Sequence, residues 1–380
     1  MLILKNNRIL QIVSFLTGSF GTTVATLFFY TFEIMHSEPP VKILNAYKGW
    51  KPLLHSVFKS TAQASAIHKN GYMVIPFLNQ EEISILTDFY NQEHNIEAEK
   101  GGMFYSLYSK DLDYRQRVHS KIAELVKPKL DLLFKDYKNI VNTFITKKPG
   151  PASEFYVHQD TTALDEFEHS PLSIWIPLQD MTSDNGAMAV VEKSHWFFSP
   201  YRSISFKQPF AAINNTLRQY LKPIYMKAGE ALVFDPRVVH NSMPNLSDKD
   251  RLVVLCGVFP QNAEFITCFK ESEPGSKIEL ILHDDVFILR NENFYYNCHE
   301  RPKTGVTIGT VDDEFADMSA ETFEELCRIN NIRKQNEPVR ASDYACEMIP
   351  EPDNTNLTRL SETPARKRGG IWHKVKAIFG

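Results

Sequence analysis

Two histidines, one aspartate and one arginine are the residues of this chain whose types and spacing best suit chemistry. His158 and Asp160 are two positions apart, and His240 lies much further along the chain. Residues two apart on a strand point to the same face, so the first two side chains can reach one ion together. Two imidazoles and one carboxylate leave other coordination positions open, as in non-haem Fe(II) sites, whereas closed zinc sites use more protein ligands, usually with thiolates. The pattern therefore predicts a mononuclear iron site.

Arg251 is the candidate partner for a carboxylic cosubstrate beside that ion. It follows His240 with ten residues between them and opens the apolar run at 252–255. A guanidinium holds a carboxylate through two parallel hydrogen bonds and keeps its charge. The alternative is a surface arginine at a strand start, after the charged residues 248–250. The spacing from His240 favours the anion-binding role.

A lone His-x-Asp pair is usually a polar loop or a strand end, so the metal-site interpretation depends on the secondary structure predicted around it. Apolar, β-prone segments at 141–145 and 172–178 flank the pair, and another at 252–255 follows Arg251. Turns with Gly, Pro and Asn-Gly separate them. Short strands with such turns predict a β-sandwich or barrel.

Helices are expected before this β-core. Asn79 can cap a helix, with Glu82 three positions later and apolar residues following on one face. A second helix is predicted over residues 114–127, and Pro128 is expected to end or kink it.

Several motifs occur together in the middle of the chain. They are Asn70-Gly71-Tyr72-Met73-Val74-Ile75-Pro76, Pro149-Gly150, His158-Gln159-Asp160, Trp175-Ile176-Pro177-Leu178, Asn185-Gly186-Ala187, Gly229-Glu230 and the spacing from His240 to Arg251. With these motifs, the stretch from about Ile67 to Pro260 resembles the phytanoyl-CoA dioxygenase family of Fe(II)/2-oxoglutarate oxygenases.

The resemblance implies a fold that is mainly β with flanking helices and has a double-stranded β-helix core of the jelly-roll, cupin-like type. It assigns three residues to Fe(II): His158, Asp160 and His240. It assigns three others to the 2-oxoglutarate site: Arg251 for the distal carboxylate, Ser242 as its helper, and Trp175, which matches a tryptophan near that cosubstrate. Oxygen is then the second cosubstrate, ascorbate can serve as a reductant, and no catalytic residue is expected beyond the metal ligands.

One departure from the family pattern lies after the Asn-Gly turn. The family usually has Pro-Gly-Ser-His, and this chain has Glu192-Lys193-Ser194-His195. The loss of Pro and Gly affects the backbone of that turn and leaves the iron ligands unchanged. His195 is the alternative third ligand, but His240 matches that position better, so His195 is expected to be structural.

The leading hypothesis is hydroxylation of a small or lipid-like organic substrate. Iron halogenases have Gly or Ala where Asp160 stands, so the carboxylate favours hydroxylation or another oxidation. A second hypothesis is a membrane-attached binding or scaffold protein that keeps the fold without turnover. A third is a cupin-like metalloenzyme that does not use 2-oxoglutarate, which Arg251 and Ser242 oppose. The sequence sets neither the substrate nor the oligomeric state.

Composition excludes some classes of protein and indicates a compartment. The chain has 380 residues, 43% of them hydrophobic, which supports a buried core rather than general disorder. The formal net charge is −4 and the core shows no basic stripe, so no nucleic-acid partner is expected. There are five cysteines and no Cys-x-x-Cys pair, which favours a reducing compartment, here the cytoplasm.

Both ends of the chain carry candidate membrane contacts. Residues 9–32 contain no charged side chain and suit a membrane span in length, although several are polar; a buried or peripheral helix is the alternative. The pattern of residues 371–379 predicts a basic amphipathic helix suited to an anionic membrane surface, and the alternative is a solvated or docked tail.

The predicted organisation has five parts, given by residue number: an apolar segment and candidate anchor at 1–40, a helical buttress at 41–140, the catalytic core at 141–262, an extension at 263–335, and a flexible linker with the basic tail at 336–380. The extension is expected to contain strands at 278–282 and 286–289 and a helix at 318–330. Residues 193–224 form either a binding loop or a packed surface helix.

Overall fold

The structure is a computed structural model that describes residues 55–94, 102–197, 201–208, 210–271, 275–290, 300–313 and 318–335. All of these residues belong to one unit of the chain, Met1–Tyr344. The predicted apolar segment at 9–32, the linker and the basic tail lie outside the described residues. Within the described ranges, no helix combines the length and the apolar character that crossing a bilayer requires.

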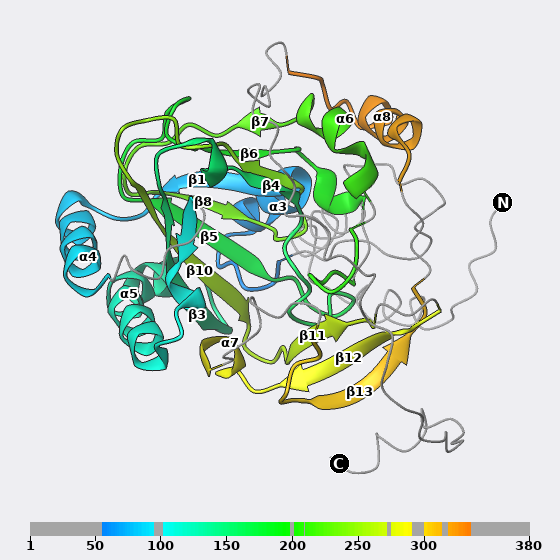
Figure 1. Cartoon of the computed structure of the whole chain (residues 1–380), viewed down its shortest axis with the longest axis horizontal. Helices are drawn as coiled ribbons and strands as arrows, with labels where there is room; N and C mark the ends of the chain where they lie inside the picture. The colour runs from blue at the N-terminus through cyan, green and yellow to red at the C-terminus, as the bar shows by residue number, and fades with distance from the viewer. Residues whose placement is uncertain are drawn as a thin grey trace, which may run out of the picture. The chain divides into compact units, whose positions relative to one another are not determined.

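Two antiparallel sheets form the core (Figure 1). The larger sheet has six strands, in the order β1 (Tyr72–Pro76), β8 (Glu230–Phe234), β5 (Leu172–Pro177), β10 (Arg251–Pro260), β3 (Tyr137–Lys147) and β2 (Met103–Tyr105). The smaller has four, in the order β4 (Phe155–His158), β9 (His240–Ser242), β6 (Met188–Val190) and β7 (Lys222–Pro223). The predicted fold class, mainly β with flanking helices and a double-stranded β-helix core, is confirmed.

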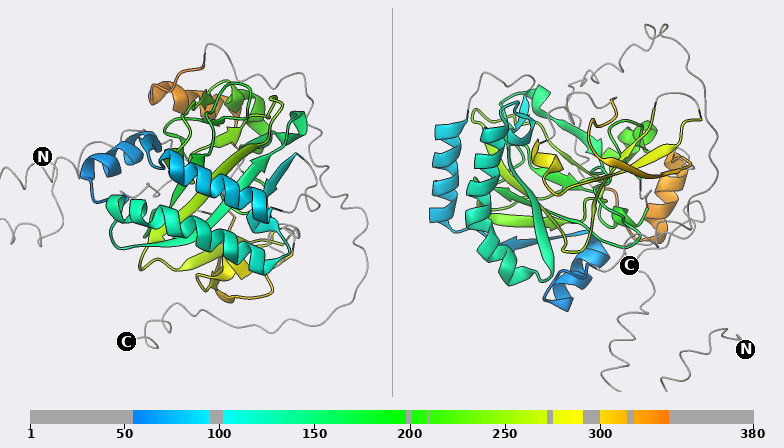
Figure 2. Two further views of the ribbon diagram at one scale, coloured as in Figure 1. Left: turned by 90° about the vertical axis from the view of Figure 1, so that its left-hand side faces the viewer. Right: turned by 90° about the horizontal axis from the view of Figure 1, so that it is seen from below.

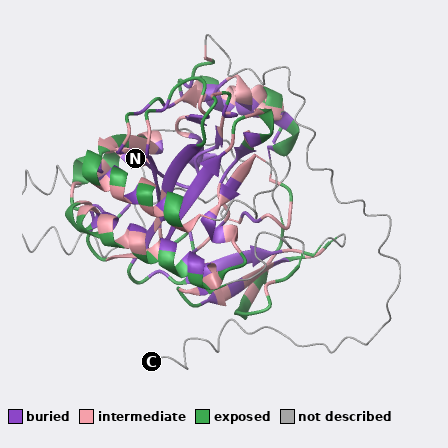
Figure 3. Cartoon of the chain, turned by 60° about the vertical axis from the view of Figure 1, so that its left-hand side comes forward, coloured by how far each residue is buried: buried purple, intermediate pink, exposed green. Residues whose placement is uncertain are grey.

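Alternation along the strands of the larger sheet separates two hydrophobic layers. On β5, Ile174 and Ile176 pack with the helical layer, whereas Trp175 between them packs with Met188 and Val190 of the smaller sheet. This follows from the two-residue period of a strand, which sends successive side chains to opposite faces. Strand β5, which is buried along its whole length, is therefore apolar apart from Ser173, and Figure 3 shows strands of the larger sheet in the buried colour.

Three helices contribute to the layer over the larger sheet: α3 (Thr61–Asn70), α4 (Gln80–Glu93) and α5 (Leu112–Leu133). Figure 2 shows α4 and α5 running side by side across it, and their outward faces are exposed in Figure 3. The predicted start of α4 is confirmed, since Asn79 and Glu82 form a reciprocal capping box.

The predicted end of the second helix at Pro128 is wrong. Helix α5 continues to Leu133, with Pro128 inside it. A proline in a helix interior costs about 3 kcal/mol. Val126 and Leu130 on either side of it are fully buried against the sheet layer, and that packing outweighs the cost.

Residues 193–224, for which the sequence allowed either a binding loop or a packed surface helix, lie over the smaller sheet. Residues 193–224 contain the 3-10 turns η5 (Ser194–Trp196) and η6 (Ala211–Ile213), helix α6 (Asn214–Arg218) and strand β7. Trp196 and Phe197 are buried together with Phe323 and Leu326 of α8 (Ala320–Ile329). Most of this region is therefore packed structure, and the predicted helix near 318–330 is confirmed.

A third sheet lies beyond the core and consists of β11 (Phe265–Phe269), β12 (Ile278–His283) and β13 (Val306–Val311). The strand predicted at 278–282 is confirmed, and the one at 286–289 is wrong, because those residues belong to a short helix, α7 (Phe287–Arg290). Periodicity cannot separate strand from helix in so short an apolar run. Here the Phe287 N–H bonds to the Asp284 carbonyl at 3.1 Å, which closes a helical turn. Two further 3-10 turns complete the described elements: η3 (Ser106–Tyr108) and η4 (Pro151–Ser153).

Candidate metal centre and cosubstrate pocket

Pairing between two short strands brings the two candidate histidine ligands together. Strands β4 and β9 are antiparallel, and His158 lies directly opposite His240 in their register. Directly opposed residues on one face are near neighbours, and here the ring centroids are 4.2 Å apart. The sheet itself therefore sets the spacing of the two imidazoles.

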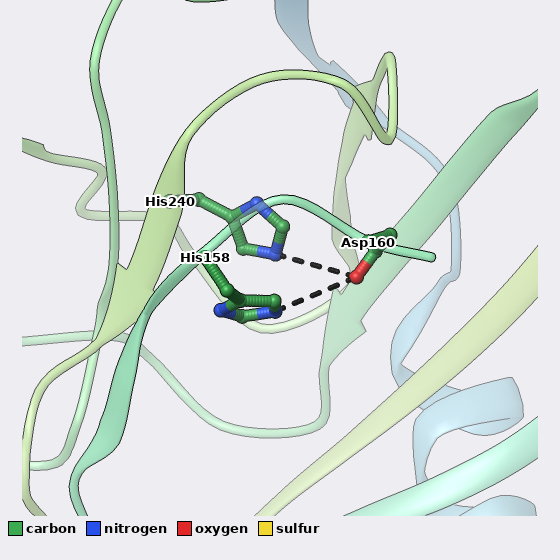
Figure 4. Close-up of side chains that lie close together, drawn as sticks. All are labelled: His158, Asp160 and His240. Atoms are coloured by element: carbon green, nitrogen blue, oxygen red, sulfur yellow. Dashed lines mark ion pairs between the residues drawn. The ribbon is translucent and has the colours of Figure 1, made fainter. Parts of the chain in front are cut away.

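Asp160 reaches the same point from a loop. The expectation that a strand carries both His158 and Asp160 is wrong, since β4 ends at His158. In Figure 4 one ring nitrogen of each histidine faces the Asp160 carboxylate. Asp160 Oδ1 lies 3.5 Å from His158 Nε2 and 3.7 Å from His240 Nε2. All three ligand atoms lie within 4.8 Å of one another, so the predicted convergence of the three side chains is present.

Backbone contacts set which imidazole nitrogen faces the carboxylate. His158 Nδ1 lies 2.9 Å from the Tyr156 carbonyl, and His240 Nδ1 lies 2.8 Å from the Val238 carbonyl. An Nδ1–H that donates to a carbonyl leaves Nε2 with its lone pair, as metal-ligating histidines require. Burial, followed by the neighbouring His158, lowers the pKa of His240 to about 4, which keeps that imidazole neutral near pH 7.

This donor set fits a ferrous ion. Ligand atoms with bonds of about 2 Å to one ion lie about 3–4 Å apart, which matches the two distances to Asp160. Two neutral imidazoles and one carboxylate give the ligand types of a non-haem iron site with open positions. The Asp160 side chain is 35% exposed, whereas His240 is 6% exposed, so access to the site is from the aspartate side.

Arg251 lines the same pocket, and no carboxylate of the described residues pairs with its guanidinium. The residue is 1% exposed, and its Nε and Nη1 have no hydrogen-bond partner among the described residues. Burial lowers its pKa to about 9. The guanidinium carbon lies 5.3 Å from the ring centre of Trp175. A buried, unpaired cation is costly, so this part of the pocket is suited to a carboxylate ligand.

The pocket combines the candidate residues with a largely apolar wall. The structure brings all six predicted site residues to it: His158, Asp160, His240, Arg251, Ser242 and Trp175. The remaining residues that line it are Tyr105, Ile145, Phe155, Met188, Phe234, Asn241 and Leu255.

The alternative third ligand, His195, lies elsewhere. It is fully buried, and its Nε2 is 2.9 Å from the His68 carbonyl. The preceding Lys193 has φ 63°, the left-handed conformation in which the family has glycine. Its N–H donates to the Asn70 carbonyl at 3.0 Å, and its Nζ donates to the Asn330 carbonyl at 3.0 Å. These contacts offset the cost of about 1–2 kcal/mol for a non-glycine residue there.

Comparison with known proteins agrees with this geometry. Residues 67–253 match the family model described as phytanoyl-CoA dioxygenase (PhyH). Residues 67–253 belong to the phytanoyl-CoA dioxygenase family. The chain is accordingly a 2-oxoglutarate-dependent non-haem iron oxygenase, and its cofactors are Fe(II) and 2-oxoglutarate. The predicted enzyme class and cofactors are confirmed.

Individual relatives are moderately similar. A phytanoyl-CoA dioxygenase of Arabidopsis thaliana is 26% identical over 242 residues, covering 50% of this chain and 84% of that protein. Phytanoyl-CoA dioxygenase 1 of Oryza sativa subsp. japonica is 30% identical over 118 residues, covering 30% of this chain and 41% of that protein. The structure of HygX from Streptomyces hygroscopicus, with nickel and 2-oxoglutarate bound, has a TM-score of 0.39 and 14% identity, covering 53% of this chain and 88% of that one.

One charged residue of this phytanoyl-CoA dioxygenase domain was missed in the sequence. Lys147 lies opposite Arg251 in the pairing of β3 with β10 and is fully buried. Its ammonium donates to the carbonyls of Ser242 at 2.7 Å and Met243 at 2.5 Å. Burial, and then the neighbouring Arg251, hold its pKa well below the usual range. A signal for it exists in the sequence, because Ile145 and Lys147 are two residues apart and share a strand face.

Proposed function

We propose that His158, Asp160 and His240 hold the Fe(II), that Arg251 holds the far carboxylate of 2-oxoglutarate, and that the enzyme hydroxylates a small or lipid-like organic substrate. One observation supports this most directly. Three ligand atoms within 4.8 Å of one another share a pocket with a buried guanidinium that has no carboxylate partner in the described part of the chain.

Bound iron, 2-oxoglutarate and O2 together supply the oxidising power, which converts 2-oxoglutarate to succinate and CO2 and oxidises the substrate. The chain contributes position and charge. Arg251 orients the dianion through the two parallel hydrogen bonds that a planar guanidinium makes with a carboxylate. The face of Trp175, 5.3 Å from that guanidinium, restricts its movement.

The surroundings of the site support an organic substrate. Apolar side chains make up much of the wall, including Ile145, Phe234 and Leu255. Such a wall excludes bulk water, and electrostatic interactions inside a dry site are stronger. The substrate would approach on the Asp160 side. The ring of Tyr156 lies 5.1 Å from that of His158 and is 51% exposed. An exposed aromatic ring beside a candidate ligand suits a substrate with apolar surface.

Succinate release tests this assignment without knowledge of the substrate. Purified full-length protein is supplied with Fe(II), 2-oxoglutarate, O2 and ascorbate, and slow uncoupled formation of succinate is expected. Asp160→Ala should abolish it, because two imidazoles alone hold Fe(II) weakly and leave its charge less balanced. His195→Gln, which removes the histidine outside the cluster, should retain it.

Two outcomes would contradict the proposal. Full succinate formation by Asp160→Ala would remove the carboxylate from the metal site. Metal binding without any succinate formation by the wild-type protein, even with candidate substrates added from a cell metabolite extract, would favour a binding protein that keeps the fold without turnover.

A further inference from the structure

The third ligand of the proposed metal site differs from the other two in what holds it. His158 and His240 stand on paired strands, whereas Asp160 lies beyond the last residue of β4. A ligand on a loop needs contacts other than a strand ladder, because metal sites require their ligands to be held closely in place. Those contacts come chiefly from residues 201–208, in the connection between β6 and β7.

We propose that Gln208 and Arg202 are positioning residues that hold the Asp160 carboxylate beside the two imidazoles. The inference rests on the proposed metal site and extends it to residues that do not touch the ion. It concerns hydrogen bonds to the backbone on either side of the Asp160 side chain.

Gln208 clamps the peptide groups of the residue between the two ligands of the His-x-Asp pair. The Gln159 N–H donates to Gln208 Oε1 at 3.0 Å, and Gln208 Nε2 donates back to the Gln159 carbonyl at 2.8 Å. One side-chain amide therefore satisfies both backbone groups of Gln159, which is 1% exposed. Such a two-way contact fixes the orientation of the loop, since rotating either peptide breaks a hydrogen bond.

Arg202 holds the next stretch of the same loop. Its Nε donates to the Asp160 carbonyl at 2.8 Å. Its backbone N–H donates to Thr162 Oγ1 at 2.8 Å, and its carbonyl accepts from the Thr162 N–H at 2.9 Å. The Asp160 N–H donates to the Pro236 carbonyl at 3.0 Å. Both backbone polar groups of Asp160 are thus held by separate parts of the chain.

A buried ion pair fixes Arg202 in turn. Its Nη1 and Nη2 donate to the two carboxylate oxygens of Glu166 at 2.8 and 2.5 Å, and both side chains are fully buried. This two-point geometry leaves Nε directed at the Asp160 carbonyl. A lysine in place of Arg202 can reach Glu166 or that carbonyl, but it has no planar fork with which to hold both.

Cobalt binding tests the proposal on the full-length, metal-free protein. Co(II) is titrated and followed by its visible absorption, which reports ligand geometry, and thermal unfolding is recorded for each variant. Gln208→Ala is expected to weaken Co(II) binding about 10–100-fold, the usual effect of losing a residue that orients a metal ligand. Arg202→Lys should weaken it in the same direction and shift the absorption bands.

Three comparisons separate positioning from general stability. Gln261→Ala removes an exposed glutamine of the turn after β10 and should leave binding unchanged. Leu86→Ala removes a fully buried side chain of α4, and should lower the unfolding temperature while keeping Co(II) affinity. In an Asp160→Ala background, Gln208→Ala should change affinity by less than about twofold, because its effect acts through the missing carboxylate.

The outcomes distinguish failure of the positioning role from failure of the proposed metal site. Binding by Gln208→Ala within about twofold of wild type would overturn the positioning role, since independent sites add to roughly that accuracy. Equal losses in Leu86→Ala, or an undiminished effect in the Asp160→Ala background, would also overturn it, because both indicate general destabilisation. A wild-type protein that does not bind Co(II) would instead contradict the proposed metal site.

Discussion

At the scale of single residues, two basic side chains, Lys147 and Arg251, face each other inside the core, and Arg251 lines the pocket. Lys147 and Arg251 occupy opposed positions on β3 and β10, and both are buried. Like charges directly opposite one another destabilise a sheet. Carbonyl oxygens satisfy the ammonium of Lys147, so the guanidinium is the group left to bind an anion. The far carboxylate of the cosubstrate would offset the positive charge of Arg251, and its binding should therefore stabilise the folded protein.

Arg251→Lys should raise the KM for 2-oxoglutarate about 10–100-fold. The lysine keeps the positive charge and loses the bidentate contact, and hydrogen bonds to charged groups contribute about 1.5–3 kcal/mol. KM is measured from succinate formation, with Co(II) affinity as the control that should stay unchanged. An unaltered KM would move the carboxylate site away from Arg251.

His195 has a consequence for stability in acid. Burial lowers its pKa to about 3 from 6.5. As the pH falls below 6.5, the unfolded chain takes up a proton that the folded chain excludes until about pH 3. The unfolded state binds more protons in this window, so the free energy of unfolding decreases as pH falls and is unaffected above it.

His195→Gln should flatten this dependence. Glutamine does not titrate, and its amide can still donate to the His68 carbonyl, the partner of His195 Nε2. The slope of unfolding free energy against pH between 6 and 4 should fall by up to about 1.4 kcal/mol per pH unit. Urea unfolding at a series of pH values measures this slope. Equal slopes for the wild-type protein and His195→Gln would contradict the prediction.

At the scale of elements, a glycine at the end of α3 lets two segments approach closely. Gly71 has φ 88°, and its N–H bonds to the Ile67 carbonyl, which ends the helix before β1. A Cβ there would lie 2.4 Å from Val238 Cγ2 and 2.7 Å from His195 Nδ1. Val238 also supplies the carbonyl that orients His240. The turn before β1 therefore packs closely against Val238, the residue whose carbonyl contacts the proposed ligand His240.

Gly71→Ala is expected to destabilise the fold by about 2–5 kcal/mol. The left-handed conformation contributes about 1–2 kcal/mol and the overpacking about 1–3 kcal/mol. Gly275→Ala is the matched control, because Gly275 has φ 81° and its Cβ would meet no described atom within 4 Å. Urea denaturation of both variants compares them. Equal losses would show that the close contact to Val238 and His195 adds nothing.

At the scale of the whole molecule, attachment to a membrane remains a prediction from the ends of the chain. Residues 9–32 carry no charge, and residues 371–379 form a basic amphipathic pattern. One weak lipid contact gives marginal binding, but two together can hold a protein at a surface. Lys5 and Arg8 before the apolar segment, with Glu33 and Glu38 after it, would put the enzyme outside if that segment spans the bilayer. The cysteines and the need for ferrous iron favour a cytoplasmic, surface-lying protein.

Cell fractionation with protease treatment of sealed vesicles tests this attachment. The protein should sediment with membranes and be digested when the cytoplasmic face points outward. Lys374→Gln combined with Lys376→Gln should weaken attachment to anionic vesicles by about 1 kcal/mol per lysine. A fully soluble wild-type protein would refute the attachment, and protection from protease would refute the orientation.

The sequence by itself determined the donor types, the core strands and the family, because these depend on residue identity and local periodicity. The two-residue alternation around Trp175 and the capping box at Asn79 are local features of this kind. Contacts between distant segments were decided by the tertiary structure. Strand pairing in the fold aligns His158 with His240 and Lys147 with Arg251. Helix α5 continues past Pro128 because the burial of neighbouring side chains outweighs the cost of a proline inside a helix. The fold also placed Asp160 off the strand, so that its position depends on residues 201–208, which no local pattern relates to a metal site.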